Sequence, residues 1–292
     1  MKNFCFITLF LAFAMQSAAQ SEQLKNAILA RLNPVEGEFA LAFKDLQTGQ
    51  TVFINEKESF HAASTMKTPV MIEIFKQAKA GKFKLTDSIL VKNEFKSTVD
   101  GSPFKLDLSD DSADEMYKKT GQQMTIYDLT YQMIIVSSNL ATNILIDLVG
   151  AKNANATMRA LGANDIQVLR GVEDSKAFQS GMNNTVTAYD LMLIFEKLAL
   201  GEVVSRKDSE AMIKILLDQK FNEIIPARLP GAAKVAHKTG SITGVQNDSG
   251  IIYLPDGRKY VLVILSRKLT DVKKGVEALA DVSGMIYDSL QH

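Results

Sequence analysis

Strand patterns lie at the two ends of this chain and helical patterns lie between them, and this order restricts the fold more than any other feature. Residues 38–56 predict two strands around a Thr-Gly turn. Towards the other end, residues 235–242 predict a third strand, and residues 250–266 predict a hairpin around a Pro-Asp-Gly turn. We therefore predict an α/β (α+β) fold, in which an antiparallel sheet from both chain ends is flanked by helices and carries an inserted all-helical subdomain.

Seven segments have apolar residues at helical spacing: 21–33, 64–81, 124–135, 140–150, 188–201, 209–219 and 271–290. Residues 93–123 and 168–187 lack this spacing and are expected to be connections. The chain is predicted to form one domain over residues 20–292, divided into a sheet part at about 20–63 and 216–292 and a helical part at about 64–215.

Residues 1–19 have the organisation of a secretory signal peptide. Lys2 gives a positive start, residues 4–15 form an apolar run too short for a stable membrane anchor, and Ser17 and Ala19 are the small residues that a signal peptidase recognises. Cleavage after Ala19 predicts a soluble, periplasmic or secreted protein without a membrane anchor, because no later apolar run is long enough to cross a bilayer. A buried N-terminal helix is the alternative.

Charge balance and the scarcity of metal-binding residue types argue against several classes of function. Lys+Arg and Asp+Glu both total 33, so no basic excess favours a nucleic-acid partner. The single cysteine, Cys5, lies in the predicted signal peptide, and the three histidines, His61, His237 and His292, are far apart in the sequence. We therefore expect no metal site and no cofactor, and we expect a monomer.

A serine and a lysine three residues apart, Ser64 and Lys67, form the first candidate for chemistry. On a helix this spacing places both side chains on one face, where the amine can reach the hydroxyl. Ser64 also stands at the start of a predicted helix, where unpaired backbone N–H groups can stabilise an oxyanion. Lysine can act as the base if burial or a second cation lowers its pKa. A Ser-His-Asp triad that uses His61 or His237 remains open.

Two further short patterns follow in the chain. Ser137 and Asn139 form a Ser-x-Asn pattern, and Lys238, Thr239 and Gly240 form a Lys-Thr-Gly string on a predicted strand. The order Ser-x-x-Lys, Ser-x-Asn, Lys-Thr-Gly is the signature of class A β-lactamases and penicillin-binding proteins. Over nearly all of the mature chain, the sequence resembles this serine β-lactamase superfamily, and its size and single helical insert are most similar to class A.

The resemblance implies a role for each matching residue in the cleavage of a β-lactam. Ser64 would attack the lactam carbonyl, Lys67 would take its proton, and Ser137 would protonate the leaving nitrogen. Lys238 would hold Ser137 and attract the substrate carboxylate. Substrate binding would also involve Asn139, Thr239, Gly240 and Ser241, and the backbone N–H groups of Ser64 and Ser241 would form the oxyanion hole.

Purely structural roles are the alternative for several of these residues. Ser137 and Asn139 are residue types that cap helices well, and a helix is predicted to begin at Leu140. Lys238 and Thr239 are ordinary residues for an exposed strand.

The sequence departs from the family pattern in two places. Ser138 replaces the acid of Ser-Asp-Asn, at a position that usually supports structure. In the loop at 168–187 the family has a glutamate two residues after an arginine, which activates the water that frees the acylated serine. Here Glu173 follows Arg170 by three residues. Glu173 is the first candidate for this deacylation base and Asp174 is the second, and an acid that braces the loop by pairing with Arg170 is the alternative.

We therefore predict a serine β-lactamase that hydrolyses β-lactam antibiotics through an acyl-serine intermediate. A D-Ala-D-Ala peptidase or a slow penicillin binder with poor deacylation is the alternative within the fold, because acylation without a positioned water gives no turnover. A non-catalytic cell-wall binding module is the alternative from another class. For the arginine that often binds the substrate carboxylate in this family, the chain offers Arg228 as a candidate.

Overall fold

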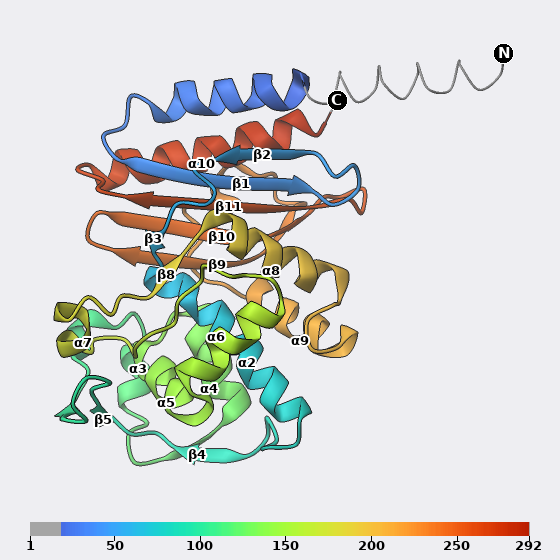
Figure 1. Ribbon diagram of the computed structural model, residues 1–292. Helices are drawn as coiled ribbons and strands as arrows, with labels where there is room; N and C mark the ends of the chain where they lie inside the picture. Colours follow the sequence, from blue (N-terminus) through green and yellow to red (C-terminus); the bar gives the residue numbers. More distant parts are fainter. Residues whose placement is uncertain (1–18, 292) are drawn as a thin grey trace.

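A five-stranded antiparallel sheet forms the centre of the computed structural model, which describes residues 19–291 (Figure 1). Its strands are β1 (Glu38–Asp45), β2 (Thr51–Ile54), β9 (Lys234–Ile242), β10 (Val245–Tyr253) and β11 (Lys259–Arg267), in the order β2-β1-β11-β10-β9. Two strands come from one end of the chain and three from the other, which confirms the predicted fold class. Apart from Ala19, the predicted signal peptide lies outside the described residues.

The segment between β2 and β9 supplies a helical region below the sheet, together with short strands and turns. In chain order its elements are β3 (Phe60–His61), η1 (Ala63–Met66), α2 (Lys67–Lys79), β4 (Ser88–Leu90), β5 (Phe95–Lys96), β6 (Pro103–Phe104), η2 (Leu108–Asp110), α3 (Asp114–Tyr117), β7 (Gln123–Thr125), α4 (Ile126–Ile135), α5 (Asn139–Val149), α6 (Ala151–Ala160), α7 (Ser175–Gln179), β8 (Thr185–Val186), α8 (Ala188–Leu200), α9 (Arg206–Leu217) and η3 (Pro226–Arg228). Here η marks a 3-10 helix. The helix α2 lies at the centre of this region and contacts α4, α5, α6 and α9.

The sheet separates two hydrophobic cores, because successive side chains of a strand point to opposite faces. On one face, Leu41 packs with the N-terminal helix (residues 19–32) and with α10 (Val272–Ser289). On the other face, the neighbouring residue Ala42 belongs to the core that continues into the helical region. Figure 1 shows the N-terminal helix and α10 on one side of the sheet and α8 on the other. Within residues 19–291, no helix is both long and apolar enough to cross a membrane.

Three local features differ from the sequence-based expectation. The helix predicted over 64–81 begins as the 3-10 helix η1, and α2 starts only at Lys67. The helix α6 was missed, because its sequence AKNANATMRA offers few large apolar residues and buries only Ala154, Thr157 and Met158. The short helix α7 interrupts the predicted connection at 168–187 and begins where the side chain of Asp174 accepts a hydrogen bond from Ala177 N.

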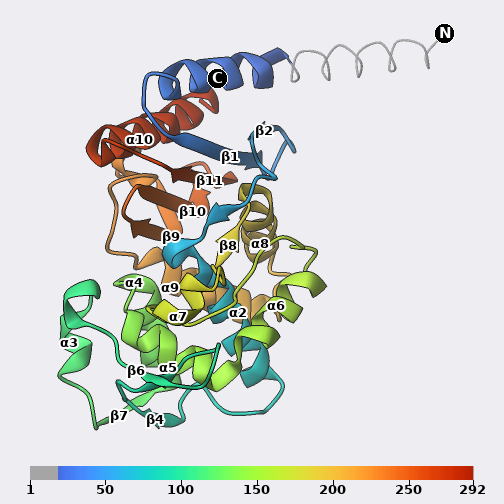
Figure 2. The same cartoon turned by 60° about the vertical axis from the view of Figure 1, so that its left-hand side comes forward.

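The strand β9 lies at the edge of the sheet that faces the helical region (Figures 1 and 2). It contacts η1, and α9 packs against it as well. This arrangement brings the Lys-Thr-Gly residues of β9 to the turn that carries Ser64.

Candidate active site

Ser64 lies on η1, directly after the short strand β3. Strand β3 pairs with β8, and the chain then turns through Ala63, whose φ of 44° is in the left-handed region that non-glycine residues rarely adopt. Ser137 and Glu173 also have positive φ values, of 59° and 61°. Backbone strain of this kind collects at functional sites, where the surrounding structure maintains it.

Lys67 is fully buried, and its amine points to the loop between α4 and α5. The Nζ donates hydrogen bonds to Ser137 O at 2.6 Å and to Asn139 Oδ1 at 3.0 Å, and it lies 3.1 Å from Ser137 Oγ. These contacts hold the lysine against the Ser-x-Asn segment, which follows it by about 70 residues in the chain.

Lys238 approaches the same hydroxyl from β9. Its Nζ lies 3.0 Å from Ser137 Oγ and donates to Thr239 O at 2.8 Å. The Ser137 hydroxyl therefore stands between two buried amines, and it can accept a hydrogen bond from one while it donates to the other. The structure thus brings together three residues that the sequence analysis selected on three separate elements.

Burial makes these two lysines poor cations. Burial lowers the pKa of Lys67 to about 7, although the negative charges of Asp111 and Glu173 partly raise it again. Burial, followed by the charge of Lys67, lowers the pKa of Lys238 well below its ordinary value. Two ammonium groups this close in a buried site repel each other, so the pair favours states in which at least one amine is neutral and able to accept a proton.

The residue between Ser137 and Asn139 caps the helix α5. Ser138 is its N-cap, and the Ser138 hydroxyl accepts a hydrogen bond from Ala141 N at 3.2 Å. The capping alternative for the Ser137 and Asn139 side chains is therefore wrong, because both side chains point to the lysines instead.

A carboxylate that the sequence analysis missed supports the start of α5. Asp111 Oδ2 accepts hydrogen bonds from Asn139 N at 2.9 Å and Leu140 N at 3.0 Å, and it lies 3.5 Å from Ser138 Oγ. A negative charge at a helix N-terminus is favourable. Ser138 thus provides the cap at this helix terminus, and Asp111 provides the negative charge. The sequence does not single out Asp111, because it is one of several acids in an irregular segment.

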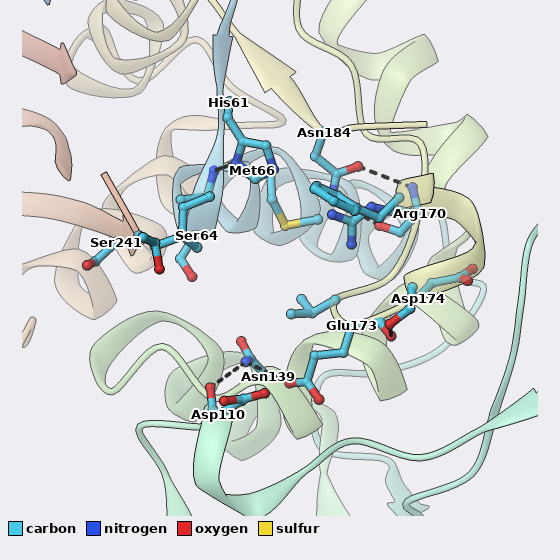
Figure 3. Close-up of a pocket in the computed structure, with 16 residues that line it drawn as sticks. His61, Ser64, Met66, Asp110, Asn139, Arg170, Glu173, Asp174, Asn184 and Ser241 are labelled. Carbon is cyan, nitrogen blue, oxygen red and sulfur yellow. Dashed lines mark hydrogen bonds between the residues drawn. The ribbon is translucent and has the colours of Figure 1, made fainter. Parts of the chain in front are cut away.

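Glu173 contacts the amide nitrogen of Asn139, whereas Lys67 contacts its amide oxygen. Figure 3 shows the Glu173 and Asn139 side chains next to each other in the cleft. Its Oε1 accepts from Asn139 Nδ2 at 3.1 Å, and its Oε2 accepts from Asp107 N at 2.9 Å. Burial raises the pKa of Glu173, and these two hydrogen bonds oppose the shift. Asn139 therefore connects a buried lysine to a carboxylate that has a raised affinity for protons.

The neighbouring acid, Asp174, braces the loop. Its Oδ1 accepts from Ser97 Oγ and Ala177 N at 2.8 and 3.1 Å, and its Oδ2 accepts from Thr98 N and Thr98 Oγ1 at 2.8 and 3.1 Å. Burial alone would raise the pKa of Asp174, but these hydrogen bonds outweigh it and lower the pKa. Asp174 accepts two hydrogen bonds on each oxygen and has a lowered pKa, whereas Glu173 accepts one on each oxygen and has a raised pKa. Asp174 therefore fits the bracing role better than the role of a base.

Arg170 does not form the ion pair with Glu173 that was the alternative for this loop. Its Nη1 donates to Gly171 O at 3.0 Å and its Nε donates to Met182 O at 3.1 Å, so the guanidinium holds the loop backbone. The alternative in which Glu173 pairs with Arg170 is therefore wrong. Within residues 19–291, Glu173 has no arginine partner.

Two cavities of about 470 and 410 Å³ meet at Ser64. Both are lined by Ser64, Asp110, Asn139 and Ser241, so they are two halves of one cleft. The first half, which we call the Glu173 half, is drawn in Figure 3 and also contains His61, Met66, Arg170 and Phe178. The second, the Thr239 half, also contains Ser137, Gly240, Gln246 and Glu223.

His237 and Arg228, the other two candidates from the sequence, do not line this cleft. His237 Nδ1 lies 2.9 Å from Asp248 Oδ1, and its Nε2 lies 3.2 Å from Asn222 Oδ1, so the ring is engaged away from Ser64. Arg228 Nε donates to Asp281 Oδ1 on α10 at 2.9 Å. The Arg228 side chain is therefore engaged with α10 and does not line either half of the cleft.

Gly240 lets β9 approach the backbone of the Ser64 turn. A β-carbon at this position would lie 2.9 Å from Ser64 N, 3.0 Å from Ala62 O and 3.0 Å from Thr65 N. These are backbone atoms and cannot rotate away, so the strand would have to move.

We expect Gly240→Ala to lower the free energy of unfolding by about 1–3 kcal/mol, as overpacking of a tight contact does. Gly231→Ala is the matched control, because a β-carbon there meets nothing within 4 Å. Chemical denaturation of both variants measures the difference, and equal stabilities would contradict this account of the contact.

Comparisons with known proteins find one family model and relatives of similar length. The model of the "Beta-lactamase enzyme family" matches residues 21–290. A β-lactamase of Bacteroides uniformis is 24% identical over 98% of this chain and 97% of its own. The crystal structure of a β-lactamase from Sphaerobacter thermophilus is 28% identical, with a TM-score of 0.77 over 91% of this chain and 96% of that chain. The structure of PBP-A is 26% identical, with a TM-score of 0.77 over 94% of this chain and 96% of that chain.

Proposed function

The chain belongs to the β-lactamase enzyme family, and from this premise we propose that it is a serine β-lactamase that hydrolyses β-lactams through an acyl-enzyme on Ser64. The observation that carries the proposal is the position of the Ser137 hydroxyl, 3.1 Å from Lys67 Nζ and 3.0 Å from Lys238 Nζ. Ser137 and Ser64 line the same half of the cleft. A nucleophile, a base of lowered pKa and a proton carrier are the groups that acyl transfer to a serine requires.

Acylation begins when the neutral amine of Lys67 accepts the proton of the Ser64 hydroxyl, directly or through water. The Ser64 oxygen adds to the lactam carbonyl, and the backbone N–H groups of Ser64 and Ser241 are the donors we propose for the oxyanion. The proton passes through the Ser137 hydroxyl to the lactam nitrogen as the C–N bond breaks. Lys238 and Thr239 hold the substrate carboxylate, and Asn139 holds the acylamide side chain.

Deacylation needs a water that attacks the ester on Ser64, and Glu173 is the base we propose for it. Glu173 and Ser64 line the same half of the cleft. The carboxylate is held by Asn139 and by Asp107 N, and burial raises its pKa towards the range in which a carboxylate is an effective base. A second group that frees the serine is what separates a β-lactamase from a protein that penicillin merely acylates.

Nitrocefin hydrolysis by the purified protein tests the proposal, with Ser64→Ala as the control. We expect repeated turnover by the wild-type protein and none by the variant. A burst of one equivalent without further turnover would favour a slow penicillin binder or a D-Ala-D-Ala peptidase. No reaction of Ser64 with nitrocefin or with a fluorescent penicillin would overturn the proposal and favour a non-catalytic module.

The acylation rate should depend on pH through Lys67, whose pKa burial lowers to about 7. Below that pH the amine is protonated and cannot accept the Ser64 proton, so the rate is expected to fall by about tenfold per pH unit and to level off above it. Stopped-flow acylation with nitrocefin at several pH values checks this. A rate that stays constant from about pH 8 to about pH 6 would contradict a role for Lys67 as the base.

We further propose that the enzyme belongs to class A and acts as an exported monomer. The support for class A is the motif order and a glutamate in the loop beside the cleft. The support for export is the pattern of residues 1–19, and the protein would then be periplasmic or secreted. N-terminal sequencing of the exported protein is expected to begin at Gln20.

A further inference from the structure

The turn that presents Ser64 depends on a hydrogen-bond acceptor from a side chain. The backbone N–H of Ala63 donates to the Nδ1 of His61 at 3.0 Å, which Figure 3 shows as a dashed line. Ala63 is the residue with the left-handed φ of 44°, so this bond closes the strained turn directly before the nucleophile. A backbone N–H left without a partner in such a place would cost free energy.

The other contacts of this turn hold its flanks. Ala62 N donates to Asn184 O at 2.9 Å beside β8, and Asn247 Nδ2 donates to His61 O at 3.0 Å from β10. Gly240 packs against the Ser64 backbone from β9. The His61 ring is therefore the group that fixes Ala63 itself.

The hydrogen bond also determines the form of the imidazole. An Nδ1 that accepts from a backbone N–H must be unprotonated, so the neutral ring carries its proton on Nε2. That Nε2 is buried in the wall of the cleft and has no hydrogen-bond partner within residues 19–291. Protonation of Nδ1 would set two N–H groups against each other and break the turn.

The charged groups around His61 oppose its protonation. The cation that acts on His61 is Arg170, which lines the same half of the cleft. Arg267 on β11 lies 4.4 Å from the centre of the Phe60 ring, but its charge is balanced by Glu38 and Glu58, at 2.6 and 2.9 Å. In the cleft half that contains His61, the acids are Glu173 and Asp174, whose carboxylates accept hydrogen bonds from other groups. The elements η1 and β8 carry no charged residue. Burial, and then the charge of Arg170, lower the pKa of His61 below its ordinary value of 6.5.

We infer that His61 is a positioning residue for the nucleophile, whose neutral Nδ1 holds Ala63 so that the Ser64 hydroxyl faces the substrate. The inference rests on the proposed function, because it assumes that Ser64 is the residue acylated. His61 touches neither substrate nor the reacting atoms in this account and acts through the backbone of the turn.

The same geometry predicts a second pH dependence of acylation. The pKa of His61 in the folded protein is lowered, so its Nδ1 stays an acceptor at the pH where an ordinary histidine becomes protonated. This acceptor is lost only as the pH falls through the lowered pKa. Below the pKa of Lys67, a plot of the log of the acylation rate against pH should therefore have a second, steeper part at low pH. There, protonation of Lys67 and protonation of His61 both oppose the reaction.

Two variants separate the acceptor from simple packing. His61→Asn places an amide oxygen close to the position of Nδ1 and does not titrate, whereas His61→Leu fills similar space without an acceptor. We expect the leucine variant to acylate about tenfold more slowly with little change in KM, and the asparagine variant to stay within about twofold of wild type. The asparagine variant should also lose the steepening at low pH.

A loss of the same size in both variants, or wild-type acylation by the leucine variant, would overturn the inference. The Tm of each variant is measured alongside, so that a loss of folding is not mistaken for a loss of positioning. If the leucine variant does not fold, the pH profile of the asparagine variant still decides the question.

Nitrogen-15 NMR of the wild-type imidazoles provides a test that is independent of activity. The chain has three histidines, so the signals that disappear in His61→Asn identify this ring. We expect an unprotonated Nδ1 and a protonated Nε2 at neutral pH, and the opposite tautomer would overturn the inference. Should wild-type protein fail to acylate with any β-lactam, the proposed function fails, whereas this spectrum still tests His61.

Discussion

Glu173→Gln protein is expected to become acylated on Ser64 at nearly the wild-type rate and then to remain acylated. The glutamine keeps the size of the side chain and a hydrogen bond to Asn139, but it cannot take a proton from water. Removal of a general base slows a step by about 10²–10⁴-fold. Intact-mass spectrometry after mixing with benzylpenicillin would show the adduct persisting in the variant and disappearing in the wild type.

The adjacent acid supplies the matched control for this experiment. Asp174→Asn removes a carboxylate that accepts hydrogen bonds from Ser97, Thr98 and Ala177, so it should lower the Tm of the protein while deacylation continues. Deacylation by Glu173→Gln at the wild-type rate would remove Glu173 from the mechanism. Trapping of the acyl-enzyme by Asp174→Asn alone would transfer the role to Asp174.

Lys67→Met is expected to abolish most of the acylation that Glu173→Gln preserves. Methionine fills the buried space of the lysine stem but offers no lone pair to the Ser64 proton, and loss of the base should slow acylation by about 10²–10⁴-fold. The rate of adduct formation with benzylpenicillin measures this, and a Tm shows that the variant is folded.

Lys76→Met is the control on the same helix. Lys76 lies on α2 as Lys67 does, but its Nζ donates to Thr157 Oγ1 at 2.8 Å, at a distance along the helix from Ser64. This variant should acylate as the wild type does. Normal acylation of Lys67→Met would show that another group, such as a water or Glu173, takes the proton.

Sequence patterns were sufficient to select the candidate residues because each pattern is short and its residues are close together in the chain. Ser64 and Lys67 lie three residues apart, and the Lys-Thr-Gly string lies on one strand. What joins the elements is contact between residues far apart in the chain: Ser137 and Lys238 are separated by 101 positions. Hydrophobic spacing at both chain ends predicted the sheet that brings them together, because the sheet is built from those ends.

The parts of the site that sequence did not predict depend on irregular backbone. The hydrogen bond that Asp111 accepts from the start of α5, and the position of Glu173, both depend on segments without periodicity. No rule of spacing places a side chain in such segments. Glu173 itself has a positive φ, and a glutamate in a sequence gives no indication of this conformation. The sequence suggests only a catalytic-base role for His61, because no sequence pattern indicates the hydrogen bond from Ala63 N to its ring.

The central claim is that a β-lactam becomes covalently attached to Ser64 in a cleft where Ser137 stands between two buried lysines. Peptide mapping by mass spectrometry of Glu173→Gln protein, after reaction with benzylpenicillin, tests it most directly. We predict one acyl group on the peptide that contains Ser64, and none in the Ser64→Ala double variant. An unmodified Ser64 peptide, or an acyl group at another residue, would contradict the claim.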